Sequence, residues 1–177
     1  MQAAKIFSAG LPLCVLLGAA STHALAEDPC AGFKWDVSKE RALFSSSVPT
    51  EEAGKDGTSA PVVVPNRLYL LQLKPRVQVV FAAVPGKTTP IEGTYAGLAV
   101  LKIPRSGGYR IAVDLPLWID VAAGGQRVPA TNYQGQQFCD APHKIVQFDL
   151  SDSQPLLLQF SGATKSTVRL TVTRVES

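Results

Sequence analysis

The segment Leu115–Val121 (LPLWIDV) contains the residue types best suited to recognising a ligand. Trp118 and Asp120 alternate with three aliphatic residues, so along a β-strand the Trp and the Asp share one face. If the aliphatic residues face the core, an exposed Trp beside a carboxylate suits a sugar ring or a peptide. The alternative is that Trp118 fills the core and Asp120 forms hydrogen bonds at the rim of that core.

Two further side chains follow downstream. Tyr133 is the one aromatic residue of the polar segment Asn132–Gln137 (NYQGQQ), and His143 closes the motif CDAPH. Loops cluster at the ends of a β-sandwich and carry binding residues, so we expect both residues near the Trp118 end. The predicted ligand contacts are therefore Trp118, Asp120, Tyr133 and His143, with a polysaccharide, a peptide or an envelope protein as the partner.

Catalytic chemistry has less support in this sequence. His143 is the only imidazole after residue 26, so it is the only candidate base for a Ser or Cys nucleophile, and there is no G-x-S-x-G motif. A carboxylate-based hydrolase remains an alternative, because the sequence does not define the separation between acidic side chains. We predict no catalytic residue. The carboxylates in question are Glu92, Asp114, Asp120, Asp140 and Asp149.

The cysteines predict a disulfide rather than a metal site. A structural zinc site needs four ligands, whereas Cys30, Cys139 and His143 supply three and have no C-x-x-C spacing. A pair of cysteines in an exported chain is expected to form a disulfide. We predict the bond Cys30–Cys139, no metal and no cofactor; two free thiols or a metal pair are the alternatives.

The N-terminal residues have the features of an export signal. Lys5 gives a positive start, Leu11–Ala20 is an uncharged apolar run, and Ala24 and Ala26 are small residues at positions −3 and −1. The apolar run is about half of the roughly 20 residues that span a bilayer. We expect cleavage after Ala26, a periplasmic or secreted protein and no membrane span after cleavage; a retained anchor is the alternative.

Composition limits the remaining functions. The chain has 177 residues, of which 46% are hydrophobic and 18% charged, which is typical of one folded domain. The formal net charge is +3 and no basic run concentrates it, which argues against a nucleic-acid partner. Scattered glycines and prolines indicate many turns and few long helices.

Hydrophobic patterning predicts three regions: a signal peptide at 1–26, an N-terminal helix and flexible linker at 27–61, and a β-sandwich at 62–177. Asp36 is the expected N-cap of the helix, and the Gly-, Ser- and acid-rich residues 47–61 are expected to form a linker or exposed loop.

From Val62 onward the hydrophobic period is two, and short strands without intervening helices favour an antiparallel, jelly-roll-like β-sandwich of about eight strands. A closed barrel is the alternative. The expected strands are Arg67–Leu73, Arg76–Ala82, Gly97–Ile103, Tyr109–Leu115, Leu117–Ala122, Lys144–Leu150, Leu156–Phe160 and Thr167–Val175.

Three segments carry a family resemblance: CAGFKWDVSKERALF, GGYRIAVDLPLWIDV and QFCDAPHKIVQFDL. They resemble a family of small exported bacterial proteins of uncharacterised function, over most of the chain after residue 26 but not over 47–61. The strand-turn rhythm around residues 108–111 is also distantly similar to pre-peptidase C-terminal-like β-sandwich domains. The resemblance implies an exported β-sandwich.

Some members of that family carry the automatic name homogentisate 1,2-dioxygenase. The name implies a non-haem iron held by two His and one carboxylate. After residue 26 the chain has one His, His143, so its own residues do not complete that ligand set. We expect instead a non-enzymatic binding or accessory module.

Overall fold

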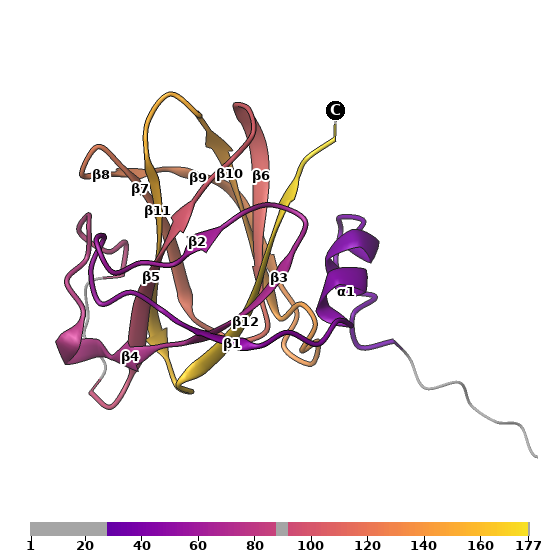
Figure 1. Cartoon of the computed structure of the whole chain (residues 1–177). Helices are drawn as coiled ribbons and strands as arrows, with labels where there is room; N and C mark the ends of the chain where they lie inside the picture. The colour runs from indigo at the N-terminus through magenta and orange to yellow at the C-terminus, as the bar shows by residue number, and fades with distance from the viewer. Residues whose placement is uncertain (1–27, 88–91, 177) are drawn as a thin grey trace, which may run out of the picture.

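A computed structural model describes residues 28–87 and 92–176, so the predicted signal peptide at 1–26 lies outside the described residues. The described chain forms one short helix and two packed β-sheets (Figure 1), which confirms the predicted β-sandwich. The elements are α1 (Ser38–Phe44), β1 (Thr50–Glu52), β2 (Val62–Val63), β3 (Leu68–Gln72), β4 (Lys74–Pro75), the 3₁₀ turn η1 (Arg76–Gln78), β5 (Tyr95–Leu101), β6 (Gly107–Val113), β7 (Trp118–Ala123), β8 (Gln126–Val128), β9 (Ala130–Gly135), β10 (Lys144–Leu150), β11 (Leu156–Ala163) and β12 (Thr167–Arg174).

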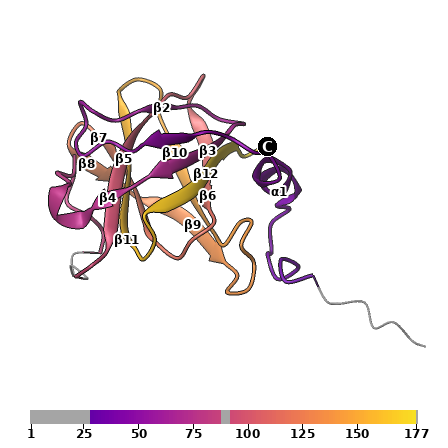
Figure 2. The ribbon, with the colours of Figure 1, turned by 60° about the horizontal axis from the view of Figure 1, so that its bottom comes forward.

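Within the described chain the strands form two six-stranded sheets rather than a closed barrel. The first sheet has the order β1-β3-β12-β6-β10-β9, and the second has the order β2-β5-β11-β7-β8 with β4 also paired to β5. Most neighbours are antiparallel, as expected, but β1 pairs with β3 and β2 pairs with β5 in parallel, so both sheets are mixed. The rotated view separates the two layers (Figure 2).

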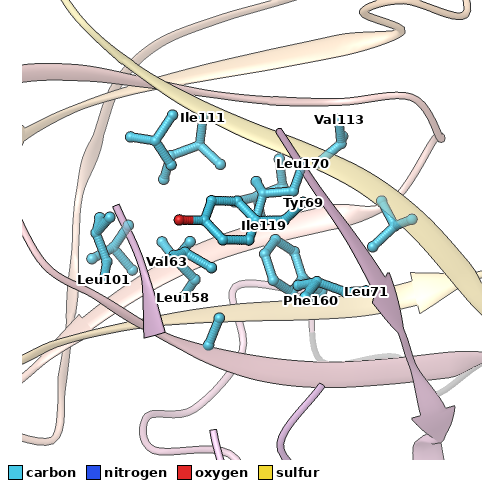
Figure 3. Close-up of a cluster of buried hydrophobic side chains, with 14 of the residues drawn as sticks. Val63, Tyr69, Leu71, Leu101, Ile111, Val113, Ile119, Leu158, Phe160 and Leu170 are labelled. Carbon is cyan, nitrogen blue, oxygen red and sulfur yellow. The ribbon is translucent and has the colours of Figure 1, made fainter. Parts of the chain in front are cut away.

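The hydrophobic core lies between the sheets, where alternate residues of the strands meet (Figure 3). On β10 the inward set is Val146, Phe148 and Leu150, and on β7 it includes Ile119 and Val121. Burying each large apolar side chain stabilises the fold by about 1.5–3 kcal/mol. This period-two burial fixes which face of each strand remains available for a site.

Helix α1 covers the outer face of the first sheet. Val37 and Phe44 pack there with Leu68 of β3 and Ala112 of β6. The helix begins at Ser38, later than the sequence predicts, and its N-cap residue is Val37, which makes no side-chain capping bond. The Asp36 carboxylate still accepts a hydrogen bond from the Ser38 amide at 2.9 Å, from one position further out.

The expectation of a linker at 47–61 is wrong in part, because this segment packs onto the sandwich. β1 pairs with β3, and Ala53 is buried. Gly54 then exchanges two backbone hydrogen bonds with Leu98 of β5, both at 2.9 Å. Backbone pairing rather than large apolar side chains holds the segment, so composition alone does not reveal it.

The predicted strand Arg76–Ala82 is also wrong. Residues 76–78 form η1, and the chain then crosses the outer face of the second sheet, where Val79 packs against Ala96 and Leu98. A further strand has no place beside β5, because β11 occupies one side and β4, Gly54 and β2 occupy the other.

The disulfide Cys30–Cys139 is present, as predicted, with a Cα–Cα distance of 4.9 Å. Both cysteines are buried. The bond ties the segment before α1 to the connection between β9 and β10, and two hydrogen bonds support the contact. The Lys34 amide donates to Gln134 Oε1 at 2.8 Å, and Gln136 Nε2 donates to the Gly32 carbonyl at 2.7 Å.

Candidate functional site

Strand β7 places Trp118 on the outer face of the second sheet. Leu117, Ile119 and Val121 belong to the hydrophobic core, so Trp118 and Asp120 share the opposite face. Trp118 is 38% exposed, whereas Asp120 is 5% exposed. Of the two readings that the sequence leaves open, the structure therefore places Trp118 at the surface and the Asp120 carboxylate beneath it.

The Asp120 carboxylate links Trp118 to the loop that contains Gly86. Its Oδ1 accepts the indole N–H of Trp118 at 3.1 Å, and its Oδ2 accepts the Gly86 amide at 3.0 Å. The guanidinium of Arg127 lies 3.8 Å from Oδ1. A buried carboxylate needs such partners, because water no longer solvates its charge. Asp120 therefore positions the Trp118 ring and the Gly86 loop.

The Trp118 groove is the hollow beside Trp118, with a volume of about 690 Å³. Segments 76–87 and 116–118, the end of β9, the start of β10 and the end of β11 form its walls, and Tyr133 and His143 line it together with Trp118. The volume lies within the range of about 300–1,000 Å³ that small-molecule sites occupy. Three of the four predicted ligand contacts thus share one groove.

A smaller hollow of about 410 Å³ adjoins this groove, and we call it the Asp120 chamber. Asp120 and Arg127 line only the chamber, whereas Trp118, Tyr133 and Lys144 line both the chamber and the groove. The four predicted residues therefore surround two hollows that share one wall.

Tyr133 lies on a strand where the sequence predicts a polar loop. Residues 130–135 form β9, the outer strand of the first sheet, and Tyr133 is directly opposite Val146 of β10. Opposite residues of an antiparallel pair point to the same face. Tyr133 therefore lies on the same face as the core residue Val146, yet it is 72% exposed because β9 is the last strand of its sheet.

His143 is half-buried at the boundary between two hollows. Its amide donates to the Val113 carbonyl at 2.9 Å, and its carbonyl accepts the Gln136 amide at 3.0 Å. The residue lines both the Trp118 groove and a hollow of about 800 Å³, the Asp114 hollow, which Asp114 and Asp140 also line.

Lys144 is the residue that the sequence interpretation missed. Lys144 lies two residues before Val146, the first of the inward-facing residues of β10. Its side chain therefore points to the same face, and its aliphatic stem enters the sandwich. Its ammonium donates to the Leu117 carbonyl at 2.9 Å and lies 5.1 Å from the centre of the Trp118 ring. Alternation along β10 is the signal that identifies Lys144 as inward-facing.

Burial lowers the pKa of Lys144, because it disfavours the charged ammonium. The Asp120 carboxylate opposes this shift, and the positive charge of Lys87 adds to it. Lys144 of the first sheet and Asp120 of the second sheet thus form an attractive charge pair beside the Trp118 groove.

The five carboxylates that the hydrolase alternative invokes do not all converge. Asp114 and Asp140 line the Asp114 hollow, whereas Asp120 lines its own chamber. The Asp114 carboxylate already accepts two hydrogen bonds from Arg169, one from its Nε and one from its backbone amide, both at 2.8 Å. Among the described residues, no group of three or more His, Cys, Asp or Glu side chains is arranged to hold a metal ion.

None of the helices within residues 28–87 and 92–176 has the length and apolar character needed to cross a membrane. No family model matches the chain, and no curated protein matches it significantly.

Proposed function

We propose that this protein is an exported, non-enzymatic binding module whose ligand occupies the Trp118 groove. The observation that carries the proposal is the outward Trp118, held by Asp120 and facing a groove that Tyr133 also lines. Aromatic rings with an exposed face bind the C–H faces of sugars or apolar side chains, and the few polar groups around them fix the ligand's orientation. Carbohydrate is the ligand class we favour, with a peptide or an envelope partner as the alternatives.

Export is part of this proposal. The Ala24-Leu25-Ala26 motif predicts signal cleavage, and the buried Cys30–Cys139 disulfide agrees with an oxidising compartment such as the periplasm. We also propose kinship with small exported bacterial proteins, because the three sequence segments resemble theirs.

Loss of ligand binding in Trp118→Ala tests the proposal. Protein purified from an exporting host is screened against arrays of glycans and peptides, and each hit is measured by calorimetry. Trp118→Ala should weaken binding at least about tenfold, the equivalent of 1.4 kcal/mol. Trp35→Ala is the matched control, because Trp35 packs beside α1, where the Arg110 guanidinium lies 4.4 Å from its ring, outside the groove.

Stability measurements separate lost binding from lost folding. Trp118 is 38% exposed, so Trp118→Ala should cost less than the roughly 3–5 kcal/mol typical of a buried aromatic side chain. Hits whose affinity is unchanged in Trp118→Ala would contradict the proposal. Hydrolysis of a bound glycan that Asp140→Asn abolishes would favour the carboxylate-hydrolase alternative at the Asp114 hollow.

A further inference from the structure

The charged residues of the Trp118 groove have one sign. Within the described chain, the charged side chains that line it are Arg76, Lys87 and Lys144, and none of the lining residues is Asp or Glu. The nearby carboxylate of Asp120 lines the adjoining chamber and already accepts hydrogen bonds from Trp118 and Gly86. A ligand in the groove therefore meets positive charge beside aromatic rings.

Two of these cations are fixed in place by similar contacts. The Arg76 guanidinium lies 4.4 Å from the centre of the Phe81 ring, and its Nη1 donates to the Val79 carbonyl at 3.2 Å. The Lys144 ammonium lies against Trp118 and donates to the Leu117 carbonyl. Cations held in this way lose less side-chain entropy when a ligand binds, so they favour an anionic ligand more strongly than mobile surface lysines do.

The electrostatic balance at Lys144 points to the same ligand charge. Burial and the neighbouring Lys87 both disfavour its ammonium form, while Asp120 only partly compensates. An anionic group placed in the groove would stabilise the charged ammonium form of Lys144. A neutral ligand would offer no such gain.

We propose that the Trp118 groove selects acidic carbohydrates, with a uronic-acid ring against Trp118 or Tyr133 and its carboxylate against Lys144. This inference rests on the proposed binding function and narrows its ligand class. Apolar ring faces with a carboxylate at the margin match an aromatic groove with cationic walls.

An acidic peptide fits the surroundings of the groove less well. A peptide would extend a sheet by pairing with the outer strand β9. β9 is irregular, because its pairing with β10 shifts register between Gln147 and Phe148, and the side chain of its Gln134 already accepts a hydrogen bond from the Lys34 amide. Bulges and covering segments are devices that block pairing at strand edges.

Calorimetric titration tests the charge selection. The probes are oligogalacturonate, alginate and hyaluronan oligomers, their carboxyl-reduced neutral counterparts, and an oligoglutamate peptide. Lys144→Met keeps an apolar stem but removes the ammonium and its hydrogen bond to the Leu117 carbonyl, so thermal unfolding must first show that the variant is folded at the temperature of the titration. Lys102→Met is the matched control, because Lys102 is exposed and lines none of the hollows described above.

At least one acidic oligosaccharide should bind about tenfold or more tightly than its reduced form, and Lys144→Met should abolish most of that difference while Lys102→Met preserves it. Equal, Trp118-dependent binding of acidic and reduced forms would overturn the charge selection and leave the binding function intact. Trp118-dependent binding of oligoglutamate alone would overturn the carbohydrate class. Failure of all probes would overturn the inference, whereas the binding function fails only if Trp118→Ala changes no hit from the arrays.

Discussion

Asp120 and Gln159 are direct cross-strand partners on β7 and β11, and both hold the same loop against the outer face of the second sheet. Asp120 accepts the Gly86 amide, while Gln159 accepts the Ala83 amide at 2.8 Å and donates to the Ala83 carbonyl at 3.2 Å. The polar pair thus converts one sheet face into an anchor for residues 83–86. One wall of the Trp118 groove depends on that anchor.

Replacing Gln159 should loosen this wall. Gln159 is 1% exposed, so Gln159→Leu keeps the volume but leaves the Ala83 amide and carbonyl without their partner. An unsatisfied buried polar group costs about 1–3 kcal/mol, so chemical unfolding should show a loss of this size. Hydrogen exchange at Ala83 should accelerate. Gln154→Leu, at an exposed position, should change neither measurement, and a protected Ala83 amide in Gln159→Leu would contradict the assigned anchor.

The sandwich was predictable because its strands bury one face. The predicted strand Lys144–Leu150 agrees with β10 at both ends, and alternation around Trp118 correctly groups it with Asp120. Alternation does not show whether a neighbouring strand has a free edge with which a segment can pair. Residues 76–82 have strand-like composition, but the sheet has no open edge beside β5 for them.

One part of the site that the sequence does not predict is polar and exposed, unlike the apolar strands of the core. β9 (ATNYQG) is polar and mostly exposed, so its strand conformation comes from pairing with β10 rather than from its own propensity. The groove walls 83–86 depend on side-chain bonds between residues distant in sequence, such as Gln159 with Ala83. A local pattern contains no signal for such bonds. Lys144 is the exception, because its inward direction follows from the alternation of β10.

The disulfide should contribute strongly to stability. The bond closes a loop with a sequence separation of 109, and the chain-entropy model assigns about 4.7 kcal/mol to a loop of roughly 100 residues. Chemical unfolding of Cys30→Ser/Cys139→Ser should show a loss on the order of 4–5 kcal/mol. A reducing agent should destabilise the wild type but leave the double variant unchanged. Equal stability of the two proteins would show that other contacts hold the segment before α1.

The Asp56 carboxyl should titrate at unusually low pH. Hydrogen bonds from the Thr58 and Ser59 hydroxyls and from their amides lower its pKa to about 2. Because the folded-state pKa lies below the unfolded value near 3.9, the stabilisation is present above that value and is lost as pH falls towards about 2. Carboxyl ¹³C NMR titration measures the shift. Thr58→Val should raise this pKa, and a pKa near 3.9 in the wild type would contradict the turn geometry.

The last prediction concerns the charge balance between Lys144 and Asp120. Burial lowers the pKa of Lys144 and Asp120 opposes that change, so Asp120→Asn should lower the pKa of Lys144 further. Between the folded pKa and the unfolded value near 10.4, the unfolded chain binds more protons, so stability should rise with pH in that window. Asp120→Asn should extend the window to lower pH.

NMR titration of the Lys144 side chain, labelled at Cε, follows the effect directly. Asp149→Asn is the matched control, because Asp149 is exposed on the same strand but lines neither the Trp118 groove nor the Asp120 chamber. Its substitution should leave the pKa of Lys144 unchanged. An unchanged or raised pKa in Asp120→Asn would show that the two charges do not interact. Burial and Lys87 alone would then set the pKa of Lys144, and the Asp120 carboxylate would have no electrostatic influence on the groove.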